Sequence, residues 1–318
     1  MMNTNLICLF TLISLSATTA QAADPSRFNG EFSLNTGVSS TSSNLDVNGS
    51  DTLSGLGKGS RTNDAFIAPL GSLSYSLNEQ NNQRVYIGTS RDDLAVGTLA
   101  FEVGYQYDYS DGTQLDIGYL PTVVADEVWS NPYLIGEKRD KSDRSGNAYR
   151  LKLSNLLGTG LSFDMVYANT EIENEAIVDP ALHRDSDTYF FKGQYRSMLS
   201  LNSGYVSALS YTDHNAQGKA ASYNGYQGEL TYFYVGQNYA LSLTGSYAYR
   251  DFDAINPIFS KQRNDDVYRV FLAYEYKNIP GWDNWSVTSF VGSTITSSNI
   301  DFYSNENMIV TLGMNYKF

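Results

Sequence analysis

The side chains best suited to bind ions or polar molecules are charged residues that alternate with apolar ones along many short segments. Because successive side chains of a strand point to opposite faces, the charged residues of such a segment share one face. Arginine and lysine bind anions such as carboxylates and phosphates, whereas carboxylates bind cations. The basic residues of this face are Arg84, Arg150, Lys152, Lys192, Arg196, Arg250 and Arg269, and the acidic ones are Glu31, Glu102, Asp108, Asp116, Asp164, Glu229 and Glu275.

Catalytic residues are sparse. Acid–base and nucleophilic mechanisms usually need a histidine beside a nucleophile or an activated water, and the chain has two histidines, His183 and His214. Both fall in predicted connections between strands. His214 follows Asp213, with Asp92 and Asp93 as further carboxylates, but adjacent residues of a strand point to opposite faces and do not form a catalytic pair without a bend. We therefore predict a protein that is not an enzyme, and keep hydrolysis as the minor alternative.

Metal and cofactor binding are not indicated. The stretch DVNGSD at 46–51 spaces its oxygen ligands as a calcium loop does, but it lacks the glutamate of the twelfth position. A turn at the Asn-Gly pair explains it better. Cys8 is the one cysteine, and it lies in a segment expected to be removed, which leaves no thiol for zinc or a disulfide. We predict no cofactor and no metal.

The elements that must position the charged face are strands. From Phe28 onward, segments of about ten residues alternate apolar and polar side chains, which is the length of a tilted strand that crosses a bilayer. After position 23 no run of eighteen apolar residues predicts a transmembrane helix. Twelve strands are the alternative if 65–90, which contains Pro69, does not form two full strands. The favoured assignment has fourteen strands, at 28–38, 65–77, 83–90, 98–109, 113–121, 147–156, 160–171, 186–197, 202–213, 221–235, 238–250, 265–276, 284–296 and 307–318.

The connections between these segments alternate between short and long, which is typical of a transmembrane barrel with short turns at one end and long loops at the other. Tyrosines gather near both ends of the segments, as they do at the two interfaces of a membrane. The predicted fold is all-β, a single antiparallel transmembrane β-barrel. Its connection 122–146 is unusually apolar. It either folds into the lumen and narrows it, or caps the barrel or extends the flanking strands.

Both ends of the chain fit an exported membrane barrel. Residues 1–22 combine a short apolar core with the sequence AQA at 20–22, which predicts a cleaved signal peptide and a barrel at 23–318. The last residues, NMIVTLGMNYKF, resemble the assembly signal of outer-membrane barrels, with Phe318 at the end and Tyr316 two residues earlier. We expect a location in the cell outer membrane. The expected partners are outer-membrane lipid and the barrel assembly machinery.

The charge and the barrel together limit what the protein binds. The chain of 318 residues has a formal charge of −13, which argues against nucleic acid as a partner. The charged face must line the lumen, because a basic side chain facing lipid costs about 2–4 kcal/mol at the midplane. Fourteen strands leave an interior too wide for side chains to fill. Inside it, basic residues of 147–197 and acidic residues of 28–121 either set up a transverse field across a pore or form salt bridges that brace the wall.

The mature start FNGEFSLNTGVSS and the ending GMNYKF resemble those of an uncharacterised family of Gram-negative outer-membrane proteins, a domain of unknown function. The resemblance covers the mature chain and implies a porin-like barrel, with no catalytic motif and no site residues. The chain is also similar, in fold only, to monomeric oligosaccharide porins of twelve to fourteen strands. We expect a monomer that lets small hydrophilic solutes diffuse passively through its lumen. The alternatives are an adhesin or structural barrel without an open pore, and a barrel hydrolase.

Overall fold

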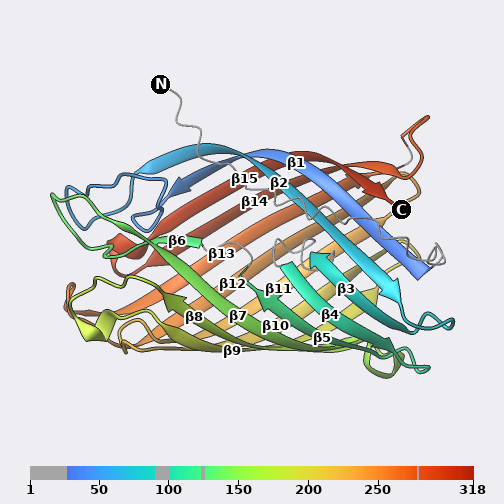
Figure 1. The fold of residues 1–318 in the computed structure, drawn as a ribbon, viewed down its shortest axis with the longest axis horizontal. Coiled ribbons are helices and arrows are strands. Elements are labelled where there is room, and N and C mark those ends of the chain that lie inside the picture. Colours follow the sequence, from blue (N-terminus) through green and yellow to red (C-terminus); the bar gives the residue numbers. More distant parts are fainter. Residues whose placement is uncertain (1–26, 90–100, 123–125, 278) are drawn as a thin grey trace, which may run out of the picture.

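The computed structural model of the chain describes residues 27–89, 101–122, 126–277 and 279–318. The predicted signal peptide at 1–22 lies outside the described residues. Long strands wind around a common axis, with short 3₁₀ turns between some of them (Figure 1). No helix in the described part of the chain is long and apolar enough to cross a membrane.

The described residues contain fifteen strands and three 3₁₀ turns. The strands are β1 (Phe28–Ser42), β2 (Arg61–Ser76), β3 (Gln83–Thr89), β4 (Phe101–Asp108), β5 (Gln114–Pro121), β6 (Asp126–Trp129), β7 (Lys141–Ser154), β8 (Leu161–Ile172), β9 (Ser186–Met198), β10 (Ser203–Ala216), β11 (Tyr223–Val235), β12 (Tyr239–Asn256), β13 (Lys261–Tyr276), β14 (Trp285–Ser298) and β15 (Asn305–Lys317). The 3₁₀ turns are η2 (Leu156–Gly158), η3 (Pro180–Leu182) and η4 (Asp301–Tyr303).

The sheet closes on itself. The described strands pair in antiparallel fashion, and β1 pairs with β15, which joins the first strand to the last. β5 pairs directly with β7, so β6 is a short addition to the far end of β7. Within the described residues the result is a closed barrel of fourteen strands with one extra strand, which confirms the predicted fold.

The two faces of the wall differ as the alternation predicts. On β1, the outward side chains Phe32, Leu34 and Val38 are exposed, whereas Asn35 on the inner face is only 1% exposed. Leu209 on β10 is 74% exposed and also points outward. A band of exposed large apolar side chains therefore surrounds the barrel, while the inner face is mostly polar.

The weakest predicted segment forms two real strands. β2 has 16 residues and β3 has 7, so the twelve-stranded alternative is wrong. β3 pairs with β2 only over Ser72–Ser76, whereas Pro69 lies beyond that stretch. Pro69 has no N–H to donate, and the described part of β3 has no residue paired with it that would accept such a hydrogen bond. Proline therefore interrupts the sequence pattern without interrupting the strand.

The two ends of the barrel are unequal. We call the end that carries the β1–β2, β5–β7 and β8–β9 connections the loop end, and the opposite end, with its shorter turns, the turn end. Several strands reach further toward the loop end than predicted: β7 begins at Lys141, and β12 continues to Asn256. An antiparallel ladder continues wherever two backbones face each other, so these extensions do not need the apolar alternation that marks the band.

Aromatic side chains form rows near both ends of the outer surface. Toward the loop end, the ring centroids of Tyr149 and Tyr167 lie 6.3 Å apart, and Tyr167 lies 5.3 Å from Tyr189. At the turn end, Trp285 contacts Tyr316, and Tyr316 contacts Phe318, with centroids 5.0 and 6.2 Å apart. Neighbouring strands bring these rings together, so the two rows follow from the pairing of the strands and their alternation.

Candidate functional site

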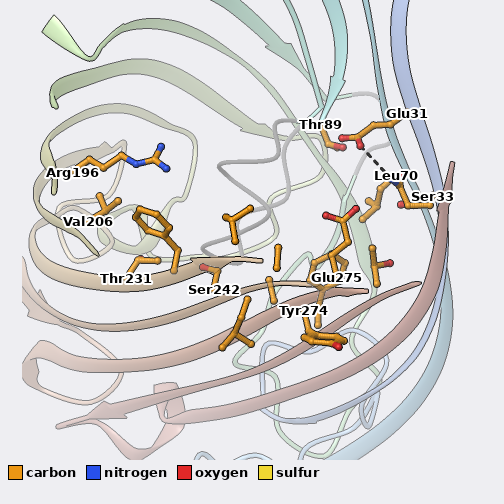
Figure 2. Close-up of a pocket in the computed structure, with 18 of the residues that line it drawn as sticks. Glu31, Ser33, Leu70, Thr89, Arg196, Val206, Thr231, Ser242, Tyr274 and Glu275 are labelled. Carbon is orange, nitrogen blue, oxygen red and sulfur yellow. Dashed lines mark hydrogen bonds between the residues drawn. The ribbon is translucent and has the colours of Figure 1, made fainter. Parts of the chain in front are cut away.

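A cavity of about 390 Å³ lies inside the barrel, near the turn end. Figure 2 shows Arg196 on one side of it and Glu275 on the other, with Ser242 between them. Among the residues predicted to line a pore, the cavity brings together Glu31, Arg150, Lys152, Asp164, Lys192, Arg196, Glu229 and Glu275. The strand register also places Arg84, Glu102, Asp108, Asp116, Arg250 and Arg269 on the inner face, outside the lining of this cavity.

A chain of partly buried hydrogen bonds runs along the wall from β3 to β8. The Tyr86 hydroxyl donates to Glu102 Oε1 over 2.5 Å. Arg150 Nη1 lies 3.3 Å from Glu102 Oε2, and its Nη2 lies 2.5 Å from Asp164 Oδ2. The three charged side chains are at most 13% exposed. The arginine thus bridges two carboxylates on different strands, which stabilises the charges of side chains that are mostly buried.

Gly118 makes this chain of contacts sterically feasible. It lies on β5, directly opposite Arg150 on β7. A Cβ atom on Gly118 would overlap the carboxylate of Glu102, so only glycine lets the side chain from β4 cross β5 to reach the arginine. The alternation of apolar and polar residues in the sequence did not reveal this crossing.

Three further pairs of oppositely charged side chains lie on the inner face. Lys192 Nζ lies 2.8 Å from Glu229 Oε1, and Arg84 pairs with Asp108. Lys317 Nζ lies 3.4 Å from Glu275 Oε1. These pairs join strands that are close neighbours in the wall. These pairs have the geometry of salt bridges that brace the wall.

The Arg150 bridge leads to a stability prediction. Replacing Arg150 with Met leaves Glu102 and Asp164 buried without their cation, so unfolding should become easier by about 3–5 kcal/mol. Denaturant titration of the barrel refolded in lipid bilayers measures this change. The matched control is Arg144→Met, because the pair of Arg144 with Asp126 is 47% and 64% exposed and should contribute less than about 1 kcal/mol. Equal effects of both variants would contradict the bracing role.

Part of the cavity wall is apolar, which the sequence analysis did not predict. Val206 on β10, Phe233 on β11 and Ala240 on β12 line the cavity next to one another, and Ala273 and Phe290 continue this surface across β13 and β14. All five lie on the inner face by register. The alternation in the sequence already places these five residues on the inner face. The sequence analysis considered only the charged residues of that face and therefore described it as polar.

Loops from around the barrel meet over the loop end. Tyr133, in the β5–β7 connection, packs against Phe259, Phe302 and Tyr303, with ring centroids 5.2–6.5 Å apart. It also packs against a second apolar cluster from the β8–β9 and β10–β11 connections. These connections arise at different positions around the wall, so their contacts span the mouth of the barrel. We call this assembly the cap; it comprises Leu53, Leu56, Tyr133, Phe259, Ile300, Phe302 and Tyr303 with Ile177, Ala181, Leu182, Ala220 and Ala254.

Polar contacts also fasten the cap. The Arg139 guanidinium is 2% exposed as a residue, stacks on Trp129 at 4.1 Å, and donates to the carbonyl oxygens of Asn44, Ser50 and Pro132. Burial lowers its pKa from the ordinary value, but an arginine stays protonated at physiological pH. This one side chain therefore ties the β1–β2 connection to the β5–β7 connection.

The same contacts decide between the alternatives for connection 122–146. Its described part contacts the other long connections: Trp129 Nε1 donates to the carbonyl oxygen of Asp46, and Arg184 donates to that of Trp129. It also extends a flanking strand, since β6 pairs with the first residues of β7. The interpretation as a loop folded into the lumen is therefore wrong for the described residues. Trp129 is buried and Tyr133 is half-buried because both pack within the cap, whereas Ile135 is exposed.

The two histidines and the 46–51 stretch have ordinary structural contacts. His214 Nδ1 lies 2.8 Å from Thr188 Oγ1, and its ring stacks on Tyr223. His183 Nε2 lies 3.0 Å from the carbonyl oxygen of Ile177 in the cap. In the 46–51 stretch, Asp46 Oδ1 accepts the backbone N–H of Asn48, which is the turn predicted there. Asp92 and Asp93 lie outside the described residues.

Comparison with known proteins places the chain in a family. Comparison with curated proteins found no match. Solved structures with similar architecture include a FadL homologue of Pseudomonas aeruginosa (9% identity, 91% of this chain and 90% of that chain, TM-score 0.46). Another is the toluene transporter TodX of Pseudomonas putida (10% identity, 92% of this chain and 90% of that chain, TM-score 0.44). A third is an anion-selective porin of Comamonas acidovorans (9% identity, 92% of this chain and 99% of that chain, TM-score 0.40). These similarities carry no information on the ligand. A family model matches residues 28–317, and the chain therefore belongs to the family described as protein of unknown function (DUF2860).

Proposed function

We propose that the protein is a channel in the bacterial outer membrane, through which small hydrophilic solutes diffuse passively. The membrane location is supported by the closed barrel and by its band of exposed apolar side chains between two rows of aromatic rings. A closed barrel with such a band buries its outer surface in lipid, because the hydrophobic effect disfavours its exposure to water.

The observation that carries the channel is the cavity inside the closed wall. Its lining includes arginine, lysine, aspartate and glutamate side chains from six strands, β1, β7, β8, β9, β11 and β13. Charged groups at such density need water or polar partners around them, so the space is suited to hydrated solutes. The cap covers the loop end above this space. We propose that the cap limits the rate at which solutes enter from outside.

Planar-bilayer recording tests the channel. The purified barrel is first shown to be folded by its heat-modifiable migration on a gel. It should then produce discrete conductance steps, and the amplitude of these steps should fall when small neutral sugars that fit the lumen are added. The physical reason is that a water-filled lumen conducts until a solute occupies it. A heat-denatured sample of the same preparation is the control. If neither the folded protein nor a variant with an opened cap conducts, the proposal fails in favour of an adhesin or structural barrel.

A further inference from the structure

We propose that Arg196 and Phe233, with the apolar side chains beside them, form a binding site in the lumen for a small carboxylate that carries an apolar, ring-sized body. The inference deepens the proposed channel by naming the class of solute, and it rests on that proposal for its biological role. It starts from three features of the cavity: the position of one guanidinium, the charges around it, and the surface next to it.

The first feature is the way the guanidinium is held. The Arg196 Cζ atom lies 4.5 Å above the ring of Phe233. Phe233 belongs to β11 and reaches Arg196 on β9 across Gly204 on β10, where a Cβ atom would come within 2.6 Å of the ring. Stacking engages the face of the guanidinium and leaves the N–H groups on its edge free to donate. A planar fork of this kind fits the two oxygens of a carboxylate.

The second feature is the distribution of charge. The cavity's carboxylates have partners of their own: Asp164 is paired with Arg150, Glu229 with Lys192, and Glu275 with Lys317. Glu31 Oε2 accepts from the side-chain amide of Asn315 at 3.4 Å. In the part of the chain that the structure describes, Arg196 has no carboxylate within 4.0 Å. The side chain therefore offers a positive charge, on a stacked support, to a molecule in the lumen.

The third feature is the surface beside the guanidinium. Val206 lies directly opposite Arg196 in the strand register, and Phe233, Val235 and Ala240 follow on the next strands. Figure 2 shows Arg196 and Val206 together on one side of the cavity, away from Glu275. A ligand that places its carboxylate at Arg196 can lay an apolar body on this surface and keep its negative charge away from Glu31 and Glu275. Burying that body adds to the affinity through the hydrophobic effect.

These features disfavour two simpler ligands. A small inorganic anion would use the charge but not the apolar surface, and a neutral sugar would leave the guanidinium without an anion. The cavity of about 390 Å³ falls within the range of pockets for small organic molecules, about 300–1,000 Å³. A carboxylate with one aromatic ring uses both the charge and the surface, and fits this volume.

Isothermal titration calorimetry on the folded, detergent-solubilised protein tests the site with sodium 4-phenylbutyrate. Wild-type protein should bind it, and Arg196→Gln should weaken the binding by about tenfold to a hundredfold, because a charge-assisted pair of hydrogen bonds is lost. The uncharged analogue 4-phenylbutyramide and the ring-free anion acetate should both bind at least about tenfold more weakly than phenylbutyrate. The matched control is Arg269→Gln, which removes another inner-face arginine that does not line the cavity, and it should bind as wild type does.

Several results would overturn the inference. They are no binding of phenylbutyrate by the wild type, equal affinity for phenylbutyramide or acetate, and wild-type affinity in Arg196→Gln. Equal loss in both arginine variants would show a general effect of charge and would also overturn it. The binding measurement does not depend on conductance. If the protein conducts without binding phenylbutyrate, this inference fails and the proposed channel stands. If it binds phenylbutyrate without conducting, the proposed channel fails and the binding site stands.

Discussion

Replacing Phe318 with Asp should remove most of the folded barrel from the outer membrane and leave the chain to periplasmic proteases. Phe318 extends the seam at which the barrel closes: its N–H donates to the carbonyl oxygen of Gly30, and the Gly30 N–H donates back to its carbonyl oxygen, both over 3.0 Å. Its ring stands in the row of aromatic side chains at the turn end, beside Tyr316. A carboxylate there removes the ring that the assembly machinery is expected to recognise and puts a charge at the interface with lipid.

The measurement is the amount of heat-modifiable protein in outer-membrane fractions, judged against two controls. Phe318→Tyr keeps an aromatic ring and should assemble normally. Tyr195→Asp puts the same charge on an exposed aromatic position at the turn end of β9, so it reports the effect of charge alone. Normal levels of Phe318→Asp, or an equal loss for Tyr195→Asp, would mean that the terminal residue is not an assembly signal.

The cap variant Tyr133→Ala should conduct far more than the wild type in planar bilayers. Tyr133 packs against both clusters of the cap, and its hydroxyl lies 2.7 Å from that of Tyr303. Truncating a fully buried aromatic side chain costs about 3–5 kcal/mol, and for the half-buried Tyr133 we expect the lower value of about 3 kcal/mol. If this energy holds the cap closed, its loss shifts the balance of closed and open states by about two orders of magnitude. Open-state occupancy should rise accordingly, at unchanged barrel stability.

Ile135→Ala is the matched control for this prediction. Ile135 lies two residues away in the same connection and is exposed, so its truncation should leave the occupancy as in the wild type. The strand wall lies outside the cap, and heat-modifiable migration of Tyr133→Ala should show that it is intact. An occupancy of the open state equal to that of the wild type would show that the cap does not limit conduction. An increase of the same size in Ile135→Ala would show the same.

The strands and the orientation of their side chains could be predicted from the sequence. The alternation in segments such as 238–250 is a local property of each strand, because neighbouring side chains always point to opposite faces. It therefore predicted fourteen wall strands, the exposed apolar band, and the inner position of residues such as Arg150 and Arg196. The loop-end extensions of β7 and β12 were missed, because hydrogen bonds between backbones continue there without an apolar face.

The pairing of the inner charges was decided by the tertiary structure. Whether Arg150 faces Asp164, Glu102 or the opposite wall depends on how far neighbouring strands are staggered. That stagger is set by backbone hydrogen bonds between segments far apart in the chain. The crossing of Glu102 over Gly118, and of Phe233 over Gly204, depends on the same stagger. The types of the side chains alone therefore could not distinguish salt bridges that brace the wall from opposed charges that set up a transverse field.

The sequence by itself determined that this chain builds a closed wall of strands with one apolar and one charged face. Period-two alternation is a local property of each strand, and a barrel lets the apolar face contact lipid while the charged face points into the interior. Only the tertiary structure decided what that wall encloses. The cap joins Leu53, Tyr133 and Phe302, which are brought together by contacts between connections with no regular pattern. The apolar surface beside Arg196 arises from single residues on adjacent strands, whose contact depends on the closure and stagger of the whole barrel.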